Sequence, residues 1–170
     1  MKRKKRGIME SGRRTARQAG YSLPELLAVI AIMGIIVVFG GPALQTALRA
    51  YRVRSMADML TTDIRALRYD AVTNRATRTM TVNDRNASPA NQYSFTNSKG
   101  KPVTIHMEQD VDIDTTSDSS ISFGINGATG STSSLSVSIS GQVNTTRGDR
   151  YTITVTPTGT VSAAYTQYTP

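Results

Sequence analysis

The chain has 170 residues and no cysteine, so neither disulfides nor cysteine-ligated metal sites are available to it. Its formal net charge of +8 at pH 7, taken alone, is typical of nucleic-acid-binding proteins. The charge is uneven, however, because residues 1–20 hold eight basic residues and one acidic residue. The remaining residues hold 12 basic and 11 acidic side chains, and this near balance argues against a nucleic-acid partner.

Residues 1–20 form a basic segment without apolar periodicity, and we interpret them as a leader. A solvated basic tail is one alternative. An ordinary secretory signal is another, with Gly41-Pro42-Ala43 as its cleavage site, but the apolar run that follows is longer than the 7–15 residues typical of such signals. Basic residues before an apolar span stay in the cytoplasm, so the bulk of the chain is expected outside the inner membrane.

An apolar run from Leu26 to Leu44 follows the leader, and it contains no charged side chain. Its 19 residues would form a helix about 28 Å long, close to the roughly 30 Å hydrocarbon thickness of a bilayer. Pro24 suits the first turn of a helix, so we expect the helix to begin near Ser22 to Pro24. The run therefore predicts a membrane-spanning helix.

Glu25 is the one acidic residue at the edge of this span. A carboxylate in the first turn of a helix is favoured by the helix dipole, but an acid within a membrane span is costly. We therefore interpret Glu25 as functional, with a carboxylate that merely reaches the membrane surface as the alternative.

Gly20, followed by Tyr21-Ser22-Leu23-Pro24-Glu25 and the apolar helix, resembles the prepilin leader motif of type IV pilins and type II secretion pseudopilins. The resemblance implies that a prepilin peptidase/N-methyltransferase cuts between Gly20 and Tyr21 and methylates the amine of Tyr21. It implies that Glu25 helps the subunit enter a growing filament. The first residue after the cut is more often Phe in the family. Gly34 and Pro42 also match the family in spacing, and we expect them to weaken or kink the helix.

The resemblance predicts an α+β, pilin-like fold in four parts. Residues 1–20 are the cleaved leader, 21–44 the transmembrane and assembly helix, 45–78 its amphipathic second half, and 79–170 a periplasmic antiparallel β domain. The second half carries apolar residues at three- to five-residue spacing, which is typical of a helix packed on a sheet: Leu44, Leu48, Tyr51, Met56, Leu60, Ile64, Leu67 and Ala71. Arg49, Arg52 and Arg54 just beyond the span would meet lipid head groups, neighbouring subunits or solvent.

From Thr79 onward the apolar residues alternate with polar ones, which predicts strands with one buried face. Turn signals separate them, and they include Asn126-Gly127, Gly148-Asp149 and Pro157 to Gly159. The helix-to-strand junction around residues 65–82 resembles that of GspH/FimT-type minor pseudopilins and minor pilins. So do Ile121 to Gly127 and Thr158 to Ser162.

Three other motifs carry little weight. Asp110, Asp112 and Asp114 are spaced as in a calcium loop, but the turn glycine is missing, so we expect a strand with a solvated acidic face. Arg147-Gly148-Asp149 spells an adhesion tripeptide and is expected in a turn. The single histidine, His106, supports no catalytic triad, so we expect no enzyme, catalytic residue, metal site or cofactor.

The leading function is a non-catalytic minor pseudopilin of type II secretion, with other pseudopilins or pilins and inner-membrane lipid as partners. A minor pilin that primes type IV pili is the close alternative. A DNA-capturing minor pilin is a third possibility. FimT-type DNA binders carry arginines after a glycine near the C-terminus, whereas this chain reads Gly159-Thr160-Val161-Ser162 there. Nucleic acid is therefore an unfavoured partner.

Overall fold

The computed structural model describes residues 22–170, and the predicted processing residues Gly20 and Tyr21 lie outside the described residues. The described part contains one long helix followed by eight strands. It divides into two compact units, with the boundary between Phe39 and Gly40. The boundary therefore falls just before Gly40-Gly41-Pro42.

Helix α1 spans Leu23–Thr73 and begins where the sequence predicts. Ser22 lies just before it, and its carbonyl accepts hydrogen bonds from the amides of Glu25 and Leu26 at 3.0 and 3.2 Å. The helix ends before the predicted boundary at residue 78. Arg75 adopts a left-handed backbone conformation with φ 48°, which stops the helical hydrogen-bond pattern.

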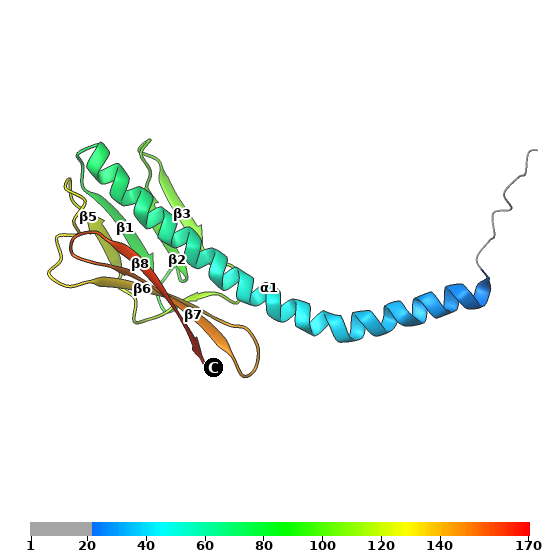
Figure 1. Cartoon of the computed structure of the whole chain (residues 1–170). Helices are drawn as coiled ribbons and strands as arrows, with labels where there is room; N and C mark the ends of the chain where they lie inside the picture. The colour runs from blue at the N-terminus through cyan, green and yellow to red at the C-terminus, as the bar shows by residue number, and fades with distance from the viewer. Residues whose placement is uncertain (1–21) are drawn as a thin grey trace, which may run out of the picture. The chain divides into compact units, whose positions relative to one another are not determined.

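The β domain consists of two antiparallel four-stranded sheets (Figure 1). The first has the order β3-β2-β1-β5, and the second has the order β4-β6-β7-β8. The strands are β1 (Arg78–Asn83), β2 (Gln92–Thr96), β3 (Pro102–His106), β4 (Asp112–Ile113), β5 (Ser120–Phe123), β6 (Leu135–Gln142), β7 (Gly148–Val155) and β8 (Val161–Tyr168). The α+β class with a long helix on antiparallel sheets is thus confirmed.

One predicted turn is wrong. Gly148 and Asp149 lie in β7, and the turn before them is closed by a hydrogen bond from the Val143 amide to the Arg147 carbonyl at 3.0 Å. Gly148 is required by packing, since a Cβ there would lie 2.3 Å from the ring of Tyr168. Gly148 is therefore needed because β7 and β8 approach closely at this point, and it does not mark a turn.

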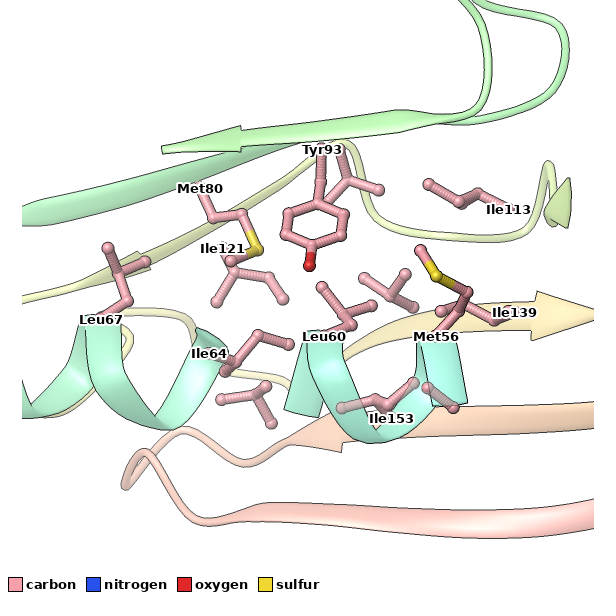
Figure 2. Packing of buried hydrophobic residues seen from close by; sticks show 14 of the residues in the cluster. Met56, Leu60, Ile64, Leu67, Met80, Tyr93, Ile113, Ile121, Ile139 and Ile153 are labelled. Atoms are coloured by element: carbon pink, nitrogen blue, oxygen red, sulfur yellow. The ribbon is translucent and has the colours of Figure 1, made fainter. Parts of the chain in front are cut away.

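The core lies between the second half of α1 and both sheets (Figure 2). Figure 2 shows Met80 and Tyr93 pointing from the first sheet toward Leu60 of the helix, while Ile139 and Ile153 approach from the second sheet. All five side chains are fully buried. The helix contributes Val53, Met56, Ala57, Leu60, Ile64, Leu67 and Ala71, which includes most of the predicted stripe. Leu44, Leu48 and Tyr51 are exposed instead.

Among the buried residues of the described hydrophobic core, Tyr93 alone carries a hydroxyl, and that hydroxyl is hydrogen-bonded to the helix. It donates a hydrogen bond of 2.7 Å to the Asp63 carboxylate. Burial, and then the hydrogen bond to Asp63 and its negative charge, raise the pKa of Tyr93 far above its usual value near 10. This contact joins β2 to α1 with a fixed geometry inside an otherwise apolar core.

The raised pKa predicts a loss of stability in base. The folded state keeps the Tyr93 proton where the unfolded state releases it, so the stabilising contribution is complete below pH about 10 and is lost as the pH rises further. We expect the free energy of unfolding to fall by up to about 1.4 kcal/mol per pH unit above that point. This fall in the free energy of unfolding is measured by urea denaturation of the full chain in detergent micelles between pH about 8 and 11.

Tyr93→Phe should remove this part of the pH dependence, because the buried ring then has no proton to release. Tyr69→Phe is the matched control, since the Tyr69 side chain is 73% exposed. Identical pH dependence in the wild-type protein and in Tyr93→Phe would contradict the assignment.

Candidate assembly and processing site

The N-terminal part of α1 presents an apolar surface on every side. No residue of its most apolar window is buried, and its large hydrophobic side chains from Leu23 to Phe39 are between 44% and 78% exposed. Each square ångström of apolar surface in water costs about 25 cal/mol, so this segment needs lipid or other helices around it. By length and composition, it is a candidate membrane span.

Glu25 lies in the first turn of this helix, and its side chain is exposed. Gly34 lies further along, and a Cβ built there would meet no atom of residues 22–170 within 4 Å. Nothing in this described part of the chain therefore requires a glycine at this position. A small residue on an exposed apolar helix lets the backbone of another helix approach closely.

Pro42 lies inside α1, yet the helix continues through it. The hydroxyl of Thr46 donates a hydrogen bond of 3.0 Å to the Pro42 carbonyl. Proline lacks an amide hydrogen, so the helix loses one backbone hydrogen bond at this point. The kink that we expect from Gly34 and Pro42 remains a prediction.

Two of the three arginines beyond the span pair with acids of the β domain, whereas Arg54 pairs with Asp58 of α1. Arg49 lies 3.7 Å from Asp110, and Arg52 lies 3.7 Å from Glu108 and 3.9 Å from Asp110. Both arginines are about 40% exposed, and ion pairs of this kind contribute little stability. They nevertheless balance positive charge just beyond the candidate membrane span.

A second set of arginines holds two loops against α1. The Arg68 guanidinium donates to the Gly127 carbonyl at 3.0 Å and to the Thr158 carbonyl at 3.4 Å. Arg65 donates to the Val161 carbonyl at 3.4 Å. Gly159 has φ +83°, and a Cβ there would lie only 1.9 Å from the Gly127 carbonyl oxygen. The two glycine turns therefore pack directly on one another beneath Arg68.

The expected solvated acidic face is wrong for Asp114 and holds for Asp110, which is exposed. The expected strand is β4, which begins at Asp112. Asp114 is 4% exposed, and its carboxylate lies 2.8 Å from Arg150 and accepts a hydrogen bond from the Ser140 hydroxyl. Asp112 accepts a hydrogen bond of 2.6 Å from the Asn91 side chain. Within residues 22–170, no group of three or more histidine, cysteine or acidic side chains could hold a metal ion.

The two charged side chains of the adhesion-like tripeptide are hydrogen-bonded to each other. Asp149 is buried, and Arg147 donates two hydrogen bonds to its carboxylate at 2.8 and 3.0 Å. The Tyr165 hydroxyl donates a third at 3.1 Å. His106 is exposed at the end of β3. The contacts among Arg147, Asp149 and Tyr165 stabilise the pairing of β7 with β8, and Asp149 is not available to a receptor.

Comparison with known proteins assigns the N-terminal part of the chain. Residues 15–40 match the family described as "Prokaryotic N-terminal methylation motif". The chain carries a type IV pilin-like prepilin signal. No curated protein and no solved structure matches the chain. The prepilin signal covers the predicted cleavage bond, Glu25, Gly34 and the apolar run as far as Gly40.

Sequence reasoning missed the contacts around Arg68, although it noted the two glycine turns as family-like. Gly127 and Gly159 marked the two turns in the sequence, because glycine tolerates the positive φ that both residues adopt. The sequence could not show that the two turns contact each other, because they are far apart along the chain.

The packing of the two turns predicts a large effect of Gly159→Ala. The added methyl group meets the Gly127 carbonyl in addition to the strain of positive φ, so we expect a loss of stability on the order of 3 kcal/mol. Gly100→Ala is the matched control, because Gly100 has φ +73° but open space around it, and about 1 kcal/mol is expected there. Chemical denaturation of the full chain in micelles measures both, and equal losses would refute the contact.

Proposed function

We propose that this protein is a non-catalytic structural subunit of a type II secretion pseudopilus, in the role of a minor pseudopilin. The observation that carries the proposal is the continuity of the prepilin signal with an apolar helix that has no partner within residues 22–170. A prepilin peptidase cuts between Gly20 and Tyr21, and the same enzyme methylates the Tyr21 amine. The processed helix then enters the filament beside the helices of other pilin-like subunits.

Charge supports one membrane orientation for the precursor. The leader holds eight basic residues and one acidic residue, whereas the rest of the chain is nearly neutral. A strongly basic flank stays in the cytoplasm. The β domain therefore lies on the periplasmic side of the inner membrane before assembly.

Glu25 provides a chemical reason for ordered assembly. Cleavage frees an α-amine with a pKa of about 7.7–8.0, so the amine is largely protonated at neutral pH. In a low-dielectric helix bundle an unpaired carboxylate is costly, and a neighbouring subunit's amine can pair with it. Pairing of Glu25 with the amine of the adjacent subunit then rewards one axial register between helices.

The charges of the β domain support a structural role over DNA capture. Arg147 and Arg150 are paired with Asp149 and Asp114, and Arg68 is committed to backbone carbonyls. DNA binding requires several cationic side chains free to meet phosphates. The proposal therefore includes neither a nucleic-acid partner nor catalysis or a cofactor.

A clean deletion tests which filament the subunit serves. Exported protein in the medium and surface pili with twitching motility are scored side by side in the deletion strain and in a complemented strain. Lost export with normal pili is the expected result. Lost pili with normal export would instead make the protein a minor pilin that primes type IV pili and would overturn the secretion assignment.

Glu25→Gln tests the assembly role. The amide keeps the shape of the side chain but cannot neutralise a neighbour's amine, so we expect incorporation into filaments to fall about tenfold or more while cleavage of the leader continues. Sheared filaments are analysed by immunoblotting and compared with the membrane fraction.

Asp58→Asn is the matched control, because it removes one carboxylate from the exposed face of the same helix, where Asp58 pairs only with Arg54 at 3.8 Å. It should be incorporated like the wild type. Normal incorporation of Glu25→Gln would contradict the proposed pairing.

A further inference from the structure

Strand β8 forms one edge of the second sheet (Figure 1). Its side chains are mostly exposed. It pairs with β7 along its full length, from Val155 opposite Val161 to Gly148 opposite Tyr168. Within residues 22–170, no strand pairs with its other edge. All residues between the two ends of β8 are exposed.

The hydrogen-bond register shows which backbone groups of β8 face outward. The Thr156 amide donates to the Thr160 carbonyl at 2.9 Å, so residue 160 belongs to a hydrogen-bonded pair with β7. Hydrogen-bonded pairs alternate along an antiparallel ladder, so the even-numbered residues of β8 bond to β7. The amides and carbonyls of Ala163, Tyr165 and Gln167 therefore point away from the sheet.

A side-chain contact supports this assignment independently. Val161 belongs to the outward-facing set, and its carbonyl accepts a hydrogen bond from Arg65 of α1 at 3.4 Å. The outward carbonyl nearest the helix is thus satisfied within the chain. The next three outward residues have no such partner among the hydrogen bonds of the described chain.

The β8 edge lacks the features that usually protect a free edge. Its sequence, VSAAYTQY, contains no charged residue and no proline. The other free edges are shorter or protected: β4 has 2 residues, β5 has 4, and β3 begins with Pro102 after Lys101. Long uncharged edges are templates for pairing with another chain, and proteins normally blunt them with charges or proline.

We propose that the β8 edge is a docking site for an extended, uncharged segment of a different pilin-like subunit, which adds to the second sheet as a further strand. The proposal rests on the proposed function, because filament assembly would hold neighbouring β domains at high effective concentration. Backbone hydrogen bonds to Ala163, Tyr165 and Gln167 supply the attachment. The cross-strand neighbours of the added segment would be the uncharged side chains of β8, which favours a partner segment without charges.

The test uses the full chain in living cells with a photo-crosslinking amino acid in place of Gln167, at the outward end of the strand. We expect an adduct whose second component, identified by mass spectrometry, is another protein with a prepilin signal. Ala163→Pro removes an outward amide without removing a hydrogen bond to β7, so the adduct should decrease about tenfold. Ala163→Lys places a charge at the same point and should act in the same direction.

Thr104→Pro is the matched control. The Met107 amide donates to the Asn91 carbonyl, so the odd residues of β3 bond to β2 and the Thr104 amide faces outward on the other free edge. This variant should leave the adduct unchanged. If Thr104→Pro lowers the adduct as much as Ala163→Pro does, the β8 assignment is overturned.

Leader cleavage is scored on the same gels. A processed, filament-associated protein that forms no adduct, or that forms adducts only with a second copy of itself, overturns the docking site and leaves the proposed function intact. A protein that keeps its leader overturns the proposed function and the docking site together.

Discussion

One helix has to satisfy two different environments, and the rest of the structure depends on this constraint. From Leu26 to Phe39 α1 is apolar on every side and has no buried residue in its most apolar window, so by length and composition this part is a candidate membrane span. From Val53 to Ala71 it is apolar on one stripe, which two sheets cover. The hydrophobic effect thus explains why the sheets cover the second half of α1, whereas the first half stays exposed within residues 22–170.

The covered stripe was predictable because helical periodicity is local. Leu60, Ile64 and Leu67 repeat at the spacing of one helix face, and the structure buries all three. The period-two pattern after residue 79 likewise identified most strands. It could not reveal two sheets, because alternation indicates which face of a strand is buried and not which strand lies beside it. The ion pairs of Asp114 and Asp149 were missed for the same reason, since buried carboxylates and exposed ones look alike in a sequence.

The candidate site was predictable to a different degree. Helix initiation near Pro24 and the exposed apolar run follow from residues close together in the chain. The roles proposed for Gly20, Tyr21 and Glu25 depend on a peptidase and on neighbouring subunits, so they cannot be derived from contacts within this chain. Most arginines of the β domain are engaged by carboxylates, as Arg150 illustrates, and Arg68 of α1 is engaged by backbone carbonyls. The surface most available for a backbone partner is consequently the uncharged edge of β8.

We propose that processing of the prepilin signal frees the apolar helix for assembly. This processing is tested by intact-mass and N-terminal peptide analysis of the membrane-associated protein from its native host. We expect a chain that begins at Tyr21 with one methyl group on its amine. A chain that retains residues 1–20, or one cut after Ala43 as by an ordinary secretory signal, would contradict it.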